Sequence, residues 1–142
     1  MGPVRSWGFG HGRAVCTLWA AVPAADLLAL LAEEGARVGL RVTRGPRSLQ
    51  LRTRWQLWVN LAQLADPIEF FNSSVMSVTV VSENAAGSAV EIGLVRGSGS
   101  QLSGRVPDAM NRVIARLTSA QVPVSVTPWD RWLGRDNRRV PL

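Results

Sequence analysis

The chain has 142 residues, of which 46% are hydrophobic, so it has the size of one domain that buries roughly two-thirds of its unfolded surface. Its formal net charge is +6, and all 16 basic residues are arginine, a bias that a GC-rich genome produces without any functional cause. The single cysteine, Cys16, excludes an internal disulfide framework and a cysteine-based zinc site. No apolar run reaches the length of about 18 residues that a membrane-spanning helix needs, which argues against a transmembrane protein.

The charges are unevenly distributed along the chain. Residues 1–54 hold eight arginines and three acids, residues 55–100 one arginine and four acids, and residues 101–142 seven arginines and three acids. Arginines that precede the apolar run AVCTLWAAV also fit a secretory signal that ends near VPA. A regular amphipathic pattern follows this run at once, so we favour a strand and a helix in a cytoplasmic protein and keep secretion as the alternative.

Three regions of unequal size are predicted. Residues 1–13, MGPVRSWGFGHGR, contain four glycines and a proline and indicate an irregular arm. We expect this arm to be flexible unless Trp7 and Phe9 dock. A single domain then spans residues 14–127, and residues 128–142 form a tail rich in tryptophan and arginine.

The domain begins with a predicted strand and helix. The apolar run of residues 14–22 is short and partly β-branched, which is typical of a strand buried on both faces. Pro23 suits the first position of a helix, and Asp26 suits its first turn, where the helix dipole favours a negative charge. The stretch AADLLALLAEEG carries leucines on one face, and Gly35 is placed to end the helix.

Alternation of arginine and aliphatic residues predicts a hairpin over residues 37–55, with RGPRS as its turn. The predicted apolar face consists of Val38, Leu40, Val42, Leu49, Leu51, Thr53 and Trp55. The opposite face collects the clearest basic surface of the sequence: Arg37, Arg41, Gln50, Arg52 and Arg54.

The remainder of the domain holds a second hairpin and a second helix. Residues 56–75 fit both a strand and a helical turn, and their structure stays open. Residues 77–81 and 89–95 are rich in β-formers and flank the turn residues SENAAGS, which predicts a hairpin. Apolar residues recur at helical spacing within residues 105–121, and VPVSVTPW closes the domain as a strand.

These elements predict an α+β domain in the order β-α-β-β-β-β-α-β. A single antiparallel or mixed sheet of about five to six strands, with two helices packed on one face, buries every apolar stripe. The first strand, the first helix and the second strand form a right-handed βαβ unit or a split version of one.

The residue types that catalysis needs are sparse. The one histidine, His11, lies in the glycine-rich arm, and GFGHG lacks the residues and the strand–turn–helix context of a phosphate-binding loop. Glu33 and Glu34 diverge on the exposed side of a helix end, while Asp66 and Glu69 flank a proline and could share a pocket. We therefore expect no catalytic apparatus, no cofactor and no metal site.

Binding is the favoured function class. We expect the basic face formed by Arg37, Arg41, Arg52 and Arg54 to attract an anionic partner, which is a nucleic acid, an acidic protein or an acidic membrane surface. The competing interpretation is a solvated exterior, because a lysine-free protein uses arginine for every surface cation. The oligomeric state stays open.

An alternative function uses tryptophans instead of arginines. Trp19, Trp55 and Trp58 lie in apolar stretches, which places them in the core or around a pocket between the sheet and the helices. Such a pocket would serve a small apolar-ligand-binding protein or an enzyme.

The tail combines indole and guanidinium groups, which together suit the headgroup layer of a membrane. Its candidate contact residues are Trp129, Trp132, Arg135, Arg138 and Arg139. We expect one indole to dock on the domain and the last three arginines to stay in water.

Overall fold

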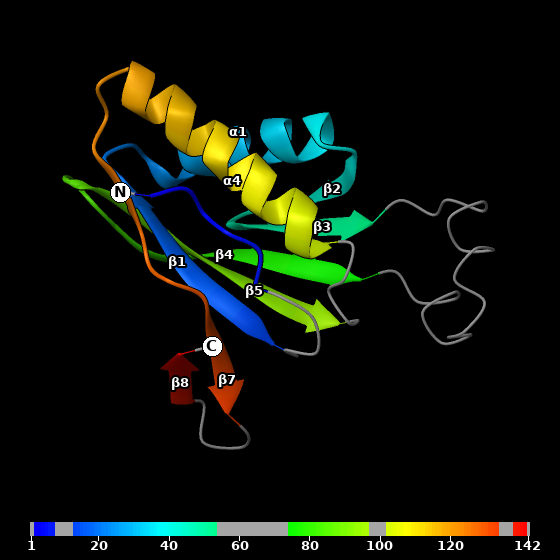
Figure 1. Ribbon diagram of the computed structural model, residues 1–142. Helices are drawn as coiled ribbons and strands as arrows, with labels where there is room; N and C mark the ends of the chain where they lie inside the picture. Colours follow the sequence, from blue (N-terminus) through cyan, green and yellow to red (C-terminus); the bar gives the residue numbers. More distant parts are fainter. Residues whose placement is uncertain (1, 8–12, 54–73, 97–101, 134–137, 142) are drawn as a thin grey trace, which may run out of the picture.

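A computed structural model describes residues 2–7, 13–53, 74–96, 102–133 and 138–141. Within these ranges the chain forms two helices and one antiparallel sheet of eight strands (Figure 1). Both helices lie on the same face of the sheet. The predicted α+β class and the order β-α-β-β-β-β-α-β are confirmed, and two short strands follow that the sequence did not indicate.

The elements in chain order are β1 (Ala14–Ala20), α1 (Ala24–Arg37), β2 (Leu40–Arg44), β3 (Ser48–Thr53), β4 (Val75–Asn84), β5 (Gly87–Arg96), α4 (Leu102–Ser119), β6 (Val124–Val126), β7 (Asp130–Leu133) and β8 (Arg138–Pro141). The strands are arranged as β2-β3-β4-β5-β1-β7-β8, and β6 also pairs with β1. Since every neighbouring pair in this path is antiparallel, β1 and β2 run parallel with three strands between them. The β1-α1-β2 unit is therefore the split version.

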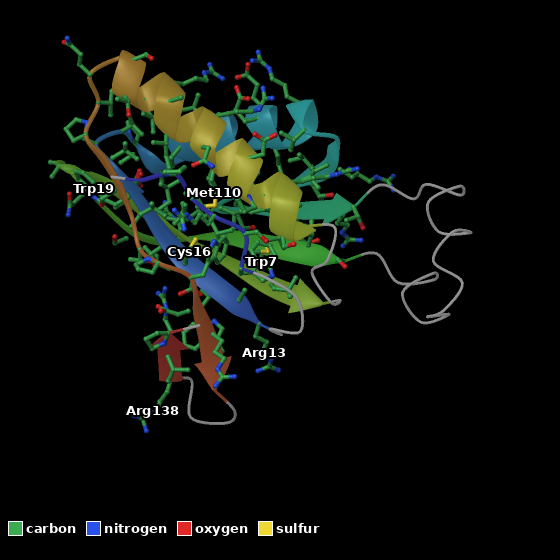
Figure 2. The ribbon with its side chains drawn as sticks, viewed as in Figure 1. Trp7, Arg13, Cys16, Trp19, Met110 and Arg138 are labelled. Atoms are coloured by element: carbon green, nitrogen blue, oxygen red, sulfur yellow. The ribbon has the colours of Figure 1, made fainter. Side chains whose placement is uncertain are left out.

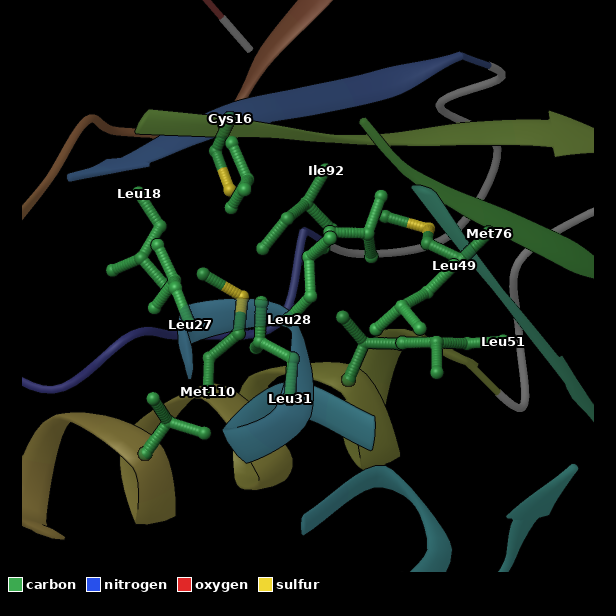
Figure 3. Close-up of a cluster of buried hydrophobic side chains, with 14 of the residues drawn as sticks. Cys16, Leu18, Leu27, Leu28, Leu31, Leu49, Leu51, Met76, Ile92 and Met110 are labelled. Atoms are coloured by element: carbon green, nitrogen blue, oxygen red, sulfur yellow. The ribbon is translucent and has the colours of Figure 1, made fainter. Parts of the chain in front are cut away.

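The hydrophobic core lies between the sheet and the two helices (Figure 3). Strand alternation turns Leu18 of β1 and Ile92 of β5 toward the helices, where Leu27 and Leu31 of α1 and Met110 of α4 meet them. All five side chains are almost completely buried. The core therefore determines which residues of each strand face away from the helices, because side chains alternate between the two faces of a strand.

The single cysteine belongs to the core. Cys16 is fully buried on β1, and this burial raises the pKa of its thiol to about 12. The thiol is consequently protonated at neutral pH and shielded from solvent.

Helix α1 ends two residues later than the predicted end at Gly35. Gly35 is buried inside the helix, and a Cβ atom there would lie 3.1 Å from Cδ2 of Leu51, so this glycine provides space for packing against β3. The backbone turns instead at Gly39, whose φ of 87° is in the left-handed region that favours glycine. The helix therefore includes Arg37, and the following strand begins only at Leu40.

The N-terminal arm and the segment after β6 contact each other. The backbone N–H and carbonyl of Val4 both bond to the side-chain amide of Asn111 on α4, at 2.8 and 2.9 Å. The buried ring of Trp7 packs edge-on against Trp129, with 4.7 Å between ring centroids, and Trp129 Nε1 donates to the carbonyl of Arg5 at 2.8 Å. Residues 2–7 are thus anchored, whereas residues 8–12 of the predicted arm, Phe9 among them, lie outside the described residues.

Candidate anion-binding surface

The β2–β3 hairpin presents a polar surface on the side of the sheet away from the helices. Arg41 lies directly opposite Arg52, and Thr43 lies directly opposite Gln50. The alternate residues of both strands, such as Leu40 and Leu51, are buried in the core. We call Arg41, Thr43, Gln50 and Arg52 the hairpin face.

The two guanidinium groups of the hairpin face have no acidic partner in the described ranges. Arg52 Nη2 donates to Gln50 Oε1 at 2.8 Å, while its buried Nε has no hydrogen-bond partner there. Arg41 is exposed, and no ion pair or hydrogen bond of its side chain occurs among the described residues. Like charges directly opposite each other destabilise a sheet, so this arrangement carries a cost that a bound anion would relieve.

The neighbouring strands extend the hairpin face with hydroxyl groups. Gln50 lies opposite Ser77 of β4, and the Ser77 and Thr79 hydroxyls are 3.2 Å apart. Glu91 of β5 lies opposite Thr79, two strands away from β3. The surface nearest the arginines therefore offers hydrogen-bond donors and positive charge.

Arg37 and Arg54, which were predicted on the basic face, are not among the residues named as the hairpin face. Arg37 is the last residue of α1 and not a strand residue, because the helix continues through Gly35. Its guanidinium is bound to Glu33 at 2.9 Å and to Glu34 at 3.3 Å. The placement of Arg37 beside Arg41 on one strand was wrong, and Arg54 lies outside the described residues.

A cluster of ion pairs joins the two helices. Arg116 of α4 donates to Glu33 Oε2 at 3.0 Å and to Glu34 Oε1 at 3.1 Å, while Arg37 binds the same two carboxylates. Glu34 is almost fully buried, which corrects the prediction that both glutamates are exposed at the helix end. The hydrogen bond and charge of Arg116 lower the pKa of Glu33, and the same bonds raise the pKa of Arg116. We call Glu33, Glu34, Arg37 and Arg116 the helix cluster.

Other arginines of α4 also have partners within the protein. Arg105 Nη1 donates to the carbonyl of Gly39 at 3.3 Å, and Arg112 lies 3.5 Å from Asp108. These side chains serve contacts of the fold.

Trp129 of the tail packs against the hydrophobic core and contacts Trp7 and Arg5 of the N-terminal arm. Arg139 is not free in water as predicted, since its guanidinium binds Asp130 at 3.0 Å and Thr17 Oγ1 at 2.9 Å. Trp132 is half-buried and lies opposite Arg139. Arg138 is exposed at the start of β8, which pairs with β7 (Figure 2). Arg135 lies outside the described residues.

The tryptophans of the alternative pocket are not brought together in the described structure. Trp19 alternates with Leu18 and Ala20 of the core, so its half-buried ring lies on the face away from the helices (Figure 2). Trp55 and Trp58 lie outside the described residues. Trp19 therefore does not line a space between the sheet and the helices.

Catalytic and metal-binding groups are equally scarce in the described structure. No group of three or more His, Cys, Asp or Glu side chains suited to a metal ion occurs within the described residues. His11, Asp66 and Glu69 lie outside them. Neither of the two described helices combines the length and the hydropathy needed to cross a membrane.

Sequence reasoning missed Arg44. This exposed residue follows Val42 by two positions, so it shares the side of β2 that faces α1, and no partner of its guanidinium occurs in the described ranges. The strand alternation that singled out Arg41 also contains this signal, but Arg44 was assigned to the predicted turn RGPRS as its first residue and was therefore not counted with the basic face.

No protein-family model matches the chain, and no curated protein matches it.

Proposed function

We propose that this protein is a non-catalytic binding module that recognises an anionic partner through Arg41 and Arg52. The observation that carries the proposal is the direct opposition of these two arginines in the sheet, with no acidic neighbour among the residues that the structure describes. Five other described arginines, Arg37, Arg47, Arg112, Arg116 and Arg139, are bound to carboxylates that compensate their charge. Arg54, by its strand parity, belongs to the same predicted surface.

Retention on immobilised heparin at low salt tests this function. An electrostatic contact with a polyanion weakens as salt rises, so the wild-type protein should bind and then elute along a salt gradient. A variant that combines Arg41→Gln and Arg52→Gln should lose affinity by at least about tenfold.

The matched control combines Arg112→Gln with Arg131→Gln, which removes the same formal charge from exposed positions outside the hairpin face. It should elute close to the wild type. Absence of wild-type retention contradicts the proposal. An equal loss in both double variants also contradicts it, because heparin would then respond only to net charge.

A further inference from the structure

Strand β2 forms one edge of the sheet. It pairs with β3 on one side, and no other strand of the described ranges pairs with it. The Gly45 N–H donates to the Ser48 carbonyl at 2.8 Å, which fixes the hydrogen-bonded positions of the hairpin. Because these positions alternate in an antiparallel pair, Thr43 and Arg41 bond to β3, while Val42 and Arg44 direct their N–H and C=O groups outward.

A groove runs beside this edge. It has a volume of about 530 Å³, and its walls are Ala29, Ala32, Glu33 and Ala36 of α1 together with Val42 and Arg44 of β2. A second hollow of about 160 Å³ shares Ala29 and Arg44 with it and continues toward the hairpin turn. Side chains of a strand added at the edge would enter this groove from alternate positions, since they point to alternate faces.

The charge of the edge determines which strand it accepts. Arg44 borders both hollows and Arg41 lies on the other face of β2, and within the described structure neither guanidinium has an acidic partner. Glu33, the one acid among the described residues that line the groove, is bound to Arg37 and Arg116. A second copy of this chain paired through β2 would bring arginines against arginines, whereas an acidic segment would compensate them.

We propose that the partner is an extended acidic peptide that binds as an additional strand along β2. Main-chain hydrogen bonds to Val42 and Arg44 supply the register, and small apolar side chains of the peptide occupy the groove beside α1. Carboxylates of the peptide meet Arg44 at the groove and Arg41 on the opposite face. This inference rests on the proposed function for its preference for acidic partners and adds the chemical class of the partner and its mode of binding.

The probe is a fluorescently labelled ten-residue peptide of alternating Val and Glu in which one central Val is replaced by Glu, so that carboxylates occur on both faces of the strand and valines remain for the groove. Its anisotropy is compared with that of the same peptide carrying prolines in place of two valines, which keeps every acidic group and prevents strand pairing. The extended peptide should bind at least about tenfold more tightly than the proline peptide. Equal affinities overturn the added strand, while salt-sensitive heparin binding through Arg41 and Arg52 would still support the proposed function.

Amide hydrogen exchange locates the contact on the intact protein. The Val42 and Arg44 amides should exchange rapidly in the free protein and become protected with the extended peptide bound, while the Thr43 amide is protected in both states. Unchanged exchange at Val42 and Arg44 under saturating peptide overturns the inference.

Filling the groove provides the matched variant. Ala36→Leu places a larger side chain on an exposed groove position of α1, and Ala115→Leu makes the same change on an exposed position of α4. The first should weaken peptide binding at least about fivefold and the second should not. Equal effects of the two substitutions contradict the groove as the binding site. Tighter binding of single-stranded oligothymidylate or of phosphatidylserine vesicles than of the peptide contradicts an acidic peptide as the partner.

Discussion

The arginines of the helix cluster and those of the hairpin face share one residue type and one charge but differ in their surroundings. Arg37 and Arg116 hold the carboxylates of Glu33 and Glu34 and join α1 to α4. Across the sheet, Arg41 faces another arginine, with no acid beside it in the described ranges. The same guanidinium group therefore stabilises the fold in one region and leaves uncompensated charge in the other.

This difference shows that the number of arginines is a poor guide to function. Paired arginines should contribute to the free energy of unfolding and little to anion binding. Unpaired, opposed arginines should show the reverse behaviour. Substitutions in each region can separate these two contributions.

The largest effect on stability is expected in the tail, because Trp129 contacts the rest of the protein. Trp129→Ala removes the ring contact with Trp7 and the hydrogen bond to the Arg5 carbonyl, so the free energy of unfolding should fall by about 2 kcal/mol. Chemical denaturation measures this loss. Removal of residues 128–142 should likewise reduce stability more than it weakens heparin binding.

Heparin binding is the control for this experiment. The folded Trp129→Ala variant should elute at nearly the wild-type salt concentration, because the hairpin face is unchanged. A large loss of retention with little change in stability would assign binding to the tail and would reverse the comparison.

A smaller loss of stability is expected from Arg116→Gln. The substitution leaves the buried carboxylate of Glu34 with Arg37 as its remaining ionic partner in the described structure. The melting temperature should fall, while heparin retention changes little. Arg112→Gln, which removes a pair between two half-exposed groups, should lower the melting temperature less.

The same variant gives a pH test. Arg116 lowers the pKa of Glu33, so the ionised carboxylate stabilises the fold above its ordinary pKa of 4.5, and this contribution is lost as pH falls through the lower folded value. The stability difference between wild type and Arg116→Gln should therefore be largest near neutral pH and narrow below about pH 4.5. Melting curves from pH 7 to pH 3 measure it, and a difference that widens in acid contradicts the ion-pair assignment.

The smallest effect has the opposite sign. Arg41→Thr relieves the repulsion from Arg52 and places a β-branched residue in a strand, so the free energy of unfolding should rise by about 0.5 kcal/mol. The same variant should bind heparin more weakly. A loss of stability would mean that Arg41 supports the fold and would remove the distinction between the two regions.

Strand and helix periodicity was sufficient to predict the fold, because the core imposes strict alternation on Cys16, Leu18 and Ile92 and helical spacing on Leu27 and Leu31. It failed at Gly35, where a glycine that provides packing space has the same sequence signature as one that ends a helix. That single error moved Arg37 onto a strand.

Long-range partners limited the prediction of the site. Alternation correctly placed Arg41 and Arg52 on one face, since this is a local property of the hairpin. The bonds from Arg116 to Glu34 and from Arg139 to Thr17 join residues 82 and 122 positions apart, which no local pattern records. The sequence can thus assign an arginine to one face of a strand, but only the folded structure shows whether an acidic side chain compensates its charge.

A nuclear magnetic resonance titration of the labelled protein with a short heparin oligosaccharide tests whether the hairpin face is the anion-binding surface. Amide shifts should concentrate in β2 and β3 around Arg41 and Arg52, with α4 and β7–β8 nearly unchanged. Shifts centred on the helix cluster or on the tail arginines, or no shifts at low salt, would contradict this assignment.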